Sequence, residues 1–319
     1  MKKPTFLDKY YKWIKIIIMV SAYTYLGYIL YHFDNYEGFA DNFSNMSWTR
    51  FLFLFFVFVL LPLNLFLESL KWKIILSGME NISIFTAFQS ILAGITTGFF
   101  TPNRIGDPLG KVLYLQEGNR VQAVALSYVA TFGQSFATFL CGIIAGFFLM
   151  FSPAFTEYQD SVGLQTTAVL FLLLLISLYF SLPYITRKFT AISKFSKLNH
   201  LLEAITEISV NRLGVISILS LVRFMVYSSQ YYLLLLFFGV DISIYEAVVA
   251  IPINYLMVSI TPSVAFSELG IRGSYAIIIL GAFTHNTPAV VLAGVTVWFI
   301  NYVIPMITGS LLLTAKKKL

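Results

Sequence analysis

A short segment between two apolar stretches combines a Thr-Pro turn with three charged side chains. It reads Thr101-Pro102-Asn103-Arg104-Ile105-Gly106-Asp107-Pro108-Leu109-Gly110-Lys111. The dipeptide Asp107-Pro108 is typical of a helix start, because Asp suits the N-cap and Pro suits the first turn. Such a helix end carries partial positive charge and free amides, and Arg104 and Lys111 add two cations beside it. The combination predicts a site for an anion such as a phosphate, whose oxygens match the planar fork of arginine.

Four further charged residues stand in apolar surroundings. Glu268 and Arg272 follow a second Thr-Pro, and their spacing lets them pair on one helix face. Arg223 lies eleven residues after Arg212, and at ~1.5 Å per residue this is roughly 16 Å along a helix. That depth is too great for the guanidinium to reach water easily, so we expect Arg223 to face a site. Glu68 lies within another apolar run, and we expect it to balance charge or to act in gating.

Four of these residues also have a plainer interpretation. Capping alone would account for Asp107, and an ion pair with Asp107 would account for Arg104. The Lys111 side chain could extend to the aqueous surface, and Glu68 could pair with Lys71 three residues later. Four polar residues in apolar runs would either line the same cavity or join helices: Asn64, Gln134, Gln230 and Asn254.

The chain as a whole is unusually apolar. Of its 319 residues, 58% are hydrophobic and 11% are charged, whereas a soluble domain has roughly 45–50% and about 25%. Backbone amides in lipid must be satisfied within the segment, so an apolar run of about 20 residues predicts a spanning helix. Runs at 13–31, 48–76, 123–151, 164–185, 215–238 and 289–314 meet this requirement. The sequence therefore predicts an all-α, polytopic membrane protein with no soluble catalytic domain.

Charge placement sets the expected topology. Basic residues cluster at 2–15, at 187–212 and at 316–318, whereas the remaining connections are mainly acidic. The positive-inside rule then places both termini in the cytoplasm. In the connector 189–211, apolar residues recur at helical spacing, which predicts an amphipathic helix along the membrane surface.

The two segments that begin with Thr-Pro belong to an internal repeat. A shift of 160 residues gives nine identities over 82–110 without a gap, and these include the Thr-Pro and a Leu-Gly pair. In each copy an apolar stretch is followed by a break and a shorter apolar stretch, and proline should end the first helix near the Thr-Pro. We expect re-entrant hairpins at 82–115 and 242–283. Their breaks contain Pro102, Gly106, Pro108, Gly110, Pro262 and Gly270.

Counting spans relates the two copies by inversion. Three predicted spans separate the breaks, so one hairpin enters from the cytoplasm and the other from outside. We therefore expect a single membrane domain, 1–319, with inverted repeats at 48–151 and 212–314. Inverted repeats with broken helices are typical of transporters that work by alternating access. The alternative is a duplication retained only for folding.

Motifs for enzymatic chemistry are absent from the sequence. It has no Gly-rich phosphate-binding loop, no His-Glu-x-x-His and no Gly-x-Ser-x-Gly. The three histidines are scattered, and the single cysteine, Cys141, has no partner at metal-binding spacing. We expect no enzymatic activity, no cofactor and no metal ion. Nucleic-acid binding is not expected either, because no basic stripe falls in an aqueous domain.

Three motifs resemble those of a known family. Gly98-Phe99-Phe100-Thr101-Pro102-Asn103-Arg104-Ile105-Gly106-Asp107 is similar to the hallmark of the lysylphosphatidylglycerol synthase transmembrane-region family of flippase-like proteins. Leu70-Lys71-Trp72 resembles its basic-Trp motif, and Thr261-Pro262 with Leu269-Gly270-Ile271-Arg272 resembles its second hallmark. Asp107 stands where the family usually has Glu, and Gly273 stands where a Glu often follows. The chain ends at Leu319, so we expect lipid translocation without lysyl transfer.

These observations predict a lipid flippase in a bacterial cytoplasmic membrane. An anionic phospholipid or a polyprenyl-phosphate-type lipid would place its headgroup against the cations, while its tails remain in the bilayer. The headgroup would bind Arg104, Lys111, Arg223 and Arg272, and Glu68, Asp107 and Glu268 would balance charge or gate access. Two alternatives remain: a non-transporting partner of a lipid-modifying enzyme or glycosyltransferase, and a transporter of small anions. An enzyme partner or a homodimer is compatible with the sequence.

Overall fold

A computed structural model describes residues 20–21, 23–33, 36–37, 40–41, 46–150, 162–263 and 265–316. Throughout these residues the regular structure is helical with no strand, which confirms the all-α class. Five described helices are long and apolar enough to cross a membrane: Trp48–Leu76, Glu117–Leu149, Gly163–Phe180, Val210–Phe237 and Thr287–Ala315. They match the predicted spans from 48–76 onward. Residues 20–21 and 23–31 of the predicted span 13–31 are described and helical, whereas the first part of that span, the basic cluster before it and the last basic residues, 317–318, lie outside the described residues.

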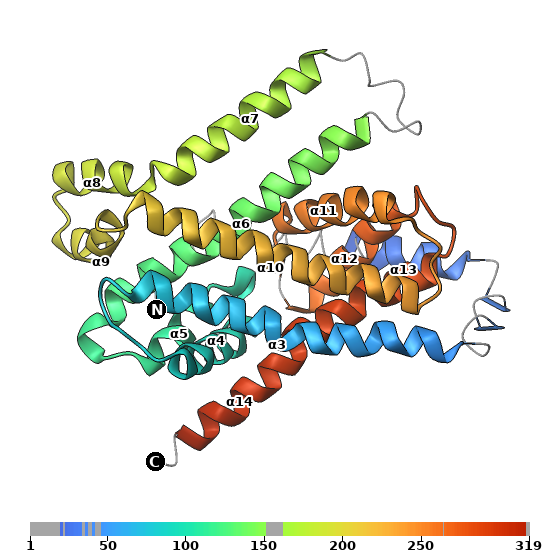
Figure 1. The fold of residues 1–319 in the computed structure, drawn as a ribbon, viewed down its shortest axis with the longest axis horizontal. Coiled ribbons are helices and arrows are strands. Elements are labelled where there is room, and N and C mark those ends of the chain that lie inside the picture. Colours follow the sequence, from blue (N-terminus) through green and yellow to red (C-terminus); the bar gives the residue numbers. More distant parts are fainter. Residues whose placement is uncertain are drawn as a thin grey trace.

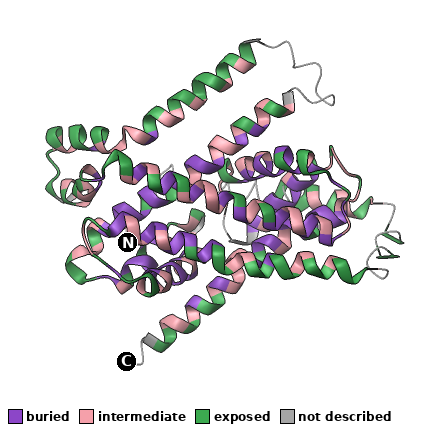
Figure 2. Cartoon of the chain, in the orientation of Figure 1, coloured by how far each residue is buried: buried purple, intermediate pink, exposed green. Residues whose placement is uncertain are grey.

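Two long helices form the centre of the bundle. Helices α3 (Trp48–Leu76) and α10 (Val210–Phe237) pack against each other and run in opposite directions (Figure 1). Side chains such as Val57 and Leu234 are fully buried in the core that they share. Buried residues concentrate along this centre, whereas much of the outer surface is exposed, as Figure 2 shows. An exposed apolar surface is expected of helices that face lipid rather than water.

The other spans surround this pair. Helix α6 (Arg120–Met150) packs on α11 (Ile244–Ile260), and α14 (Ile304–Lys316) packs on α4 (Ile84–Phe99). The last span consists of α13 (Thr287–Trp298), one π-helical turn (η5, Phe299–Val303) and α14. Helix α7 (Val162–Phe180) contacts α6 and α8, and most of its length stands apart from the bundle (Figure 1). Near its end, the buried Tyr179 hydroxyl donates to the Leu213 carbonyl of α10.

Both breaks lie where the sequence predicted them. Helix α4 ends at Phe99, one residue short of its Thr-Pro, and α11 ends at Ile260, directly before its own. The first turns of the two helices are capped by Ser83 and Ser243. After the first break come η1 (Pro102–Arg104), α5 (Asp107–Lys111), η2 (Val112–Tyr114) and η3 (Glu117–Asn119). After the second break comes α12 (Ala265–Leu280). In Figure 1, α4 and α5 lie at the end of the bundle where α3 ends, and α11 and α12 lie toward the opposite end.

The connector differs from the single helix that we predicted at 189–211. Helix α8 (Leu182–Ile192) already begins before this range, and α9 (Ser196–Thr206) follows after a break. Polar groups interrupt the helix here: Asn199 donates its side-chain amide to the Ser193 carbonyl at 3.0 Å, and the Phe195 amide donates to the Ser193 hydroxyl at 3.3 Å. Serine and asparagine side chains compete in this way with helical hydrogen bonds. Helix α9 packs on α6.

Glycines allow α4 and α5 to approach closely. A Cβ atom on Gly94 would lie 2.7 Å from Asp107 Oδ1, and one on Gly98 would lie 3.1 Å from Asp107 Cβ. On the α5 side, a Cβ on Gly110 would lie 2.3 Å from the Ala93 carbonyl oxygen. The small-residue spacing at positions 94 and 98 therefore serves close helix packing, as expected for interfaces in lipid.

Gly110→Ala is expected to destabilise the protein because the new methyl group would collide with the backbone of α4. Gly146→Ala provides the matched control, since nothing lies within 4 Å of the added Cβ. There, alanine should be neutral or stabilising by up to ~1 kcal/mol, the helix-interior preference of Ala over Gly. Thermal unfolding of both variants in detergent checks the prediction. Equal unfolding temperatures for the two variants would contradict the close packing of α4 on α5.

Candidate functional site

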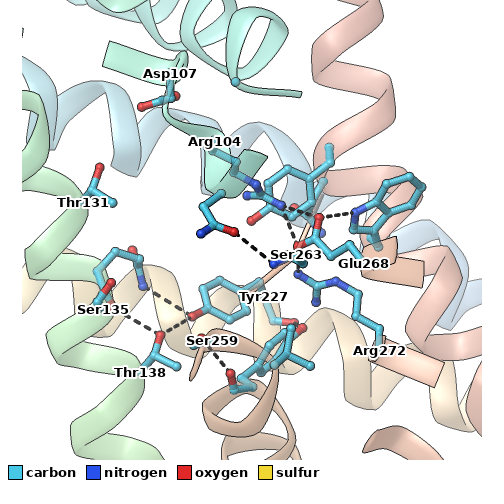
Figure 3. A pocket seen from close by; sticks show the side chains of 18 of the residues that line it. Arg104, Asp107, Thr131, Ser135, Thr138, Tyr227, Ser259, Ser263, Glu268 and Arg272 are labelled. Carbon is cyan, nitrogen blue, oxygen red and sulfur yellow. Dashed lines mark hydrogen bonds and ion pairs between the residues drawn. The ribbon is translucent and has the colours of Figure 1, made fainter. Parts of the chain in front are cut away.

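A cavity of about 450 Å³ lies where the two breaks approach each other. The helices that line it are α3, α4, α5, α6, α10, α11, α12 and the last span, together with both Thr-Pro segments. Five charged side chains face it: Arg104, Asp107, Arg223, Glu268 and Arg272. Figure 3 shows several of them from close by. The cavity thus brings together five of the seven charged residues predicted for the site, and the other two, Glu68 and Lys111, lie directly behind its wall.

Glu268 is the centre of one cluster of charges. One guanidinium nitrogen of Arg104 lies 2.9 and 3.0 Å from the two carboxylate oxygens, and Arg272 approaches the first oxygen at 2.8 Å. The indole of Trp298 donates to the second oxygen at 3.1 Å. The predicted pair between Glu268 and Arg272 is confirmed. Arg104, by contrast, pairs with Glu268 and not with Asp107, the partner considered from the sequence.

The backbone of the first break places Arg104. Asn103 and Arg104 both have positive φ, 48° and 58°. Asparagine tolerates this region, but arginine at such a φ costs roughly 1 kcal/mol or more, and strain of this kind gathers at functional sites. Asn103 is also held by the other break: its amide donates to the Ser263 carbonyl at 3.0 Å, and the Ser263 amide donates to its side-chain oxygen at 3.0 Å. The guanidinium of Arg104 then rests 3.6 Å from the ring centroid of Tyr302.

Glu68 is the centre of a second cluster. Its carboxylate lies 2.6 Å from Lys71, which confirms the predicted intrahelical pair, and 3.2 Å from Arg223. Arg223 also donates to the side-chain oxygens of Asn64 at 2.7 Å and Gln134 at 3.0 Å. These contacts hold the Arg223 guanidinium at the cavity wall.

Lys111 and Asp107 extend this second cluster to the first break. Their charged atoms lie 2.6 Å apart, and Lys111 Nζ lies 3.8 Å from Glu68. The Lys111 side chain is 4% exposed, so it does not extend to the surface. The prediction that Asp107 caps a helix is wrong, because Gly106 occupies the N-cap and Asp107 is the first helical residue. Since α5 has only five residues, side chains and not the helix end supply the positive charge.

Each cluster has one more cation than carboxylate. Arg104 and Arg272 share Glu268. Lys71, Lys111 and Arg223 share Glu68 and Asp107. In addition, Arg272 is 9% exposed, and its Nε atom has no hydrogen-bond partner among the described residues. The arrangement leaves a buried positive excess beside the cavity, which is suited to a bound anion.

Several residues that build the site gave no clear signal in the sequence. Trp298 and Tyr302 lie in an apolar run, where aromatic residues are ordinary. Lys71 was considered as a partner for Glu68 and as part of the basic-Trp motif, but not as a residue of the site. Of the polar residues, Asn64 and Gln134 line the cavity. Gln230 instead joins helices, donating to the Val57 carbonyl at 2.9 Å, and Asn254 is buried away from the cavity lining.

The break residues have mainly packing roles. Gly106 and Gly110 face α4, and a Cβ on either would lie within 2.6 Å of its backbone. Gly270 packs against the ring of Tyr23, which a Cβ would approach to 3.2 Å. Pro262 lines the cavity, and Pro108 is buried in the first turn of α5.

Comparison with known proteins agrees with this architecture. The sequence profile described as the lysylphosphatidylglycerol synthase TM region matches residues 13–309. The chain belongs to this family. The match includes both breaks, the five described spans up to residue 309 and every charged residue of the two clusters. It confirms the resemblance inferred from the motifs. Membership associates this membrane protein with a lipid-related, flippase-like role. Neither a curated protein nor a solved structure matches the chain.

Proposed function

We propose that this lysylphosphatidylglycerol synthase TM region protein is a flippase that moves an anionic or phosphate-bearing lipid between the leaflets of a bacterial cytoplasmic membrane. The observation that carries the proposal is the positive excess around the cavity between the breaks. An unpaired charge at the bilayer centre costs at least ~2.5–3.5 kcal/mol. A phosphate in the cavity would offset that cost.

Glu268 suggests how the anion would be received. Its carboxylate accepts hydrogen bonds from Arg104, Arg272 and Trp298. A phosphate presents more acceptor oxygens of the same kind and would compete for the two guanidinium groups. Glu268 would then hold the cations in place between transport events and return to them when the lipid leaves.

The shape of the cavity favours a lipid over a small soluble anion. Four lining residues are exposed: Asn103, Thr131, Ser259 and Ile260. They come from the first break, α6 and the end of α11, so the cavity has a mouth between these elements. A headgroup could enter through this mouth while the acyl chains stay in the bilayer. A small-anion transporter would instead require a cavity sealed from lipid.

Inverted repeats would provide the two access states. Helices α3 and α10 correspond under the 160-residue shift and run antiparallel in Figure 1. The same shift places α4 on α11 and α6 on the last span, which ends in α14. The contact of α4 with α14 therefore corresponds to the contact of α11 with α6. The reciprocal bonds between Asn103 and Ser263 join positions that are 160 residues apart. We propose two re-entrant hairpins meeting near the membrane midplane, which rock about this contact in alternating access.

Lipid transfer in liposomes tests the proposed function. Purified protein is expected to move acyl-chain-labelled phosphatidylglycerol between leaflets faster than the labelled neutral glycolipid monoglucosyldiacylglycerol, measured by chemical quenching of the outer leaflet and corrected for the rate in protein-free liposomes. The reason is that only the anionic headgroup relieves the positive excess. Equal rates for both lipids would argue against a cation-lined route. If no lipid moves under an applied pH or sodium gradient, the proposal fails, and the connector helices α8 and α9 become the surface on which to seek a partner enzyme.

A further inference from the structure

A π-helical turn interrupts the last span at the cavity. In this turn, Phe299–Val303, the hydrogen bonds run over one more residue than in an α-helix, and the Ile304 amide donates to the Phe299 carbonyl. Asn301 and Tyr302 of the turn both line the cavity. Single π-helical turns inside α-helices occur frequently at functional sites. Its position at the cavity wall therefore points to a role in the site.

The two neighbouring side chains of this turn reach different charge clusters. The centroid of the Tyr302 ring lies 3.6 Å from the Arg104 guanidinium and 5.9 Å from that of Arg272, which are cation–π distances. Asn301 instead accepts a hydrogen bond from the side-chain amide of Asn64. Through Asn64, which holds the guanidinium at the centre of the second cluster, the turn contacts both clusters.

A chain of side-chain amides runs from Arg223 to the backbone of α3. Arg223 Nε donates to Asn64 Oδ1 at 2.7 Å, and the Asn64 amide donates to Asn301 Oδ1. The Asn301 amide donates to Gln230 Oε1 at 2.9 Å, and the Gln230 amide donates to the Val57 carbonyl at 2.9 Å. A guanidinium can only donate and a carbonyl can only accept, so the two ends of the chain fix the orientation of every amide in it.

Burial makes this amide chain rigid. Asn64 and Gln230 are buried, with 2% and 0% of their surface exposed. Asn301 is also tied to its own helix, because its amide donates to the Val297 carbonyl at 3.0 Å. A buried polar group without a partner is unfavourable. Removal of the Asn301 amide would leave the Asn64 nitrogen unpaired, and Asn64 would turn toward another acceptor and release Arg223.

The amide chain fixes the plane of the Arg223 guanidinium. Asn64 holds its Nε atom, and Gln134 and Glu68 hold its Nη1 atom at 3.0 and 3.2 Å. The nitrogens of a guanidinium form a rigid planar fork, so holding two of them fixes the third. Among the described residues, none accepts a hydrogen bond from that third nitrogen, Nη2. Because Arg223 lines the cavity, this nitrogen remains for an anion.

We infer that Asn301 is a positioning residue of the anion site, which acts through Asn64 to orient the Arg223 guanidinium toward a bound lipid phosphate. This inference rests on the proposed function and adds to it a residue that acts on the anion through others. Since Tyr302 of the same turn lies against Arg104, the π-helical turn would also set the cations of the two clusters relative to each other.

A double-mutant cycle in liposomes tests the inference. The mole fraction of labelled phosphatidylglycerol that gives half-maximal transfer is measured for each variant. Asn301→Leu should raise this fraction about fivefold, as expected from the loss of one neutral hydrogen bond, with the maximal rate little changed. Arg223→Gln should raise it at least as much, and the double variant should be no worse than Arg223→Gln alone, because residues that act through one another are not additive. Effects that multiply, or a wild-type value for Asn301→Leu, would overturn the inference.

Two further variants complete the test. Asn119→Leu is the matched control, because Asn119 donates its amide to Glu80 at 2.9 Å away from the cavity lining, and it should transfer lipid as the wild type does. If Asn301→Leu does not fold, Asn64→Leu removes the middle of the chain, and its effect must likewise vanish in the Arg223→Gln background. Independent effects in a protein that moves phosphatidylglycerol overturn this inference and leave the flippase standing, whereas a wild-type protein that moves no anionic lipid overturns both.

Discussion

Replacement of Arg104 by glutamine is expected to slow the transfer of anionic lipid by about tenfold or more, because hydrogen bonds to charged groups contribute about 1.5–3 kcal/mol. Arg104 contacts both oxygens of Glu268 and lines the cavity, so its guanidinium is placed to meet an incoming phosphate. Glutamine keeps a polar side chain and carries a similar backbone cost at positive φ. The effect is therefore expected in the transfer rate more than in folding. Initial rates in liposomes with labelled phosphatidylglycerol measure it.

Two companion variants separate the causes. Arg187→Gln changes an exposed arginine on α8, outside the cavity, and should transfer lipid at the wild-type rate. Arg104→Lys retains the charge without the planar fork, so an intermediate rate would show that geometry matters beyond charge. A wild-type rate for a well-folded Arg104→Gln protein would remove Arg104 from the transport route.

Local spacing revealed those parts of the site that lie within one helix. The pairs Glu68 with Lys71 and Glu268 with Arg272 were expected from intervals of three and four residues, and both form. The helix ends at the two Thr-Pro segments also follow from a local cause, the missing amide of proline. The five described spans follow from the length of the apolar runs.

Contacts across the bundle could not be predicted in this way. Arg104 and Glu268 are 164 residues apart, and no periodicity links them. Asp107 was expected to cap a helix, but the absence of a side chain at Gly94 leaves room for its carboxylate beside Lys111. Tyr302 contributes through its ring, and an aromatic residue in an apolar run gives no sign of its partner. Sequence thus identified most of the charges, while the packing of separate helices decided how they pair.

Removal of the Glu68 carboxylate is expected to cause the largest loss of stability. The change Glu68→Gln would leave Lys71, Lys111 and Arg223 with Asp107 as their remaining carboxylate. Breaking a buried ion pair by removing one partner costs about 3–5 kcal/mol, because the other charge stays buried without compensation. The variant should unfold at a markedly lower temperature in detergent. Glu117→Gln provides the control, since Glu117 is largely exposed beside Arg120 and such pairs contribute about 0–1 kcal/mol.

A second substitution should restore much of that stability. In the double variant Glu68→Gln and Lys71→Met, one buried cation leaves together with the carboxylate, so the cluster returns to a single excess positive charge. Methionine fills a similar volume, and replacing a buried ion pair by apolar side chains is often neutral or stabilising. The double variant should therefore unfold at a higher temperature than Glu68→Gln alone. If the double variant is no more stable, the loss of stability in Glu68→Gln arises from the hydrogen bonds of Glu68 and not from uncompensated charge. The positive excess would then no longer explain why this cluster lies beside the cavity.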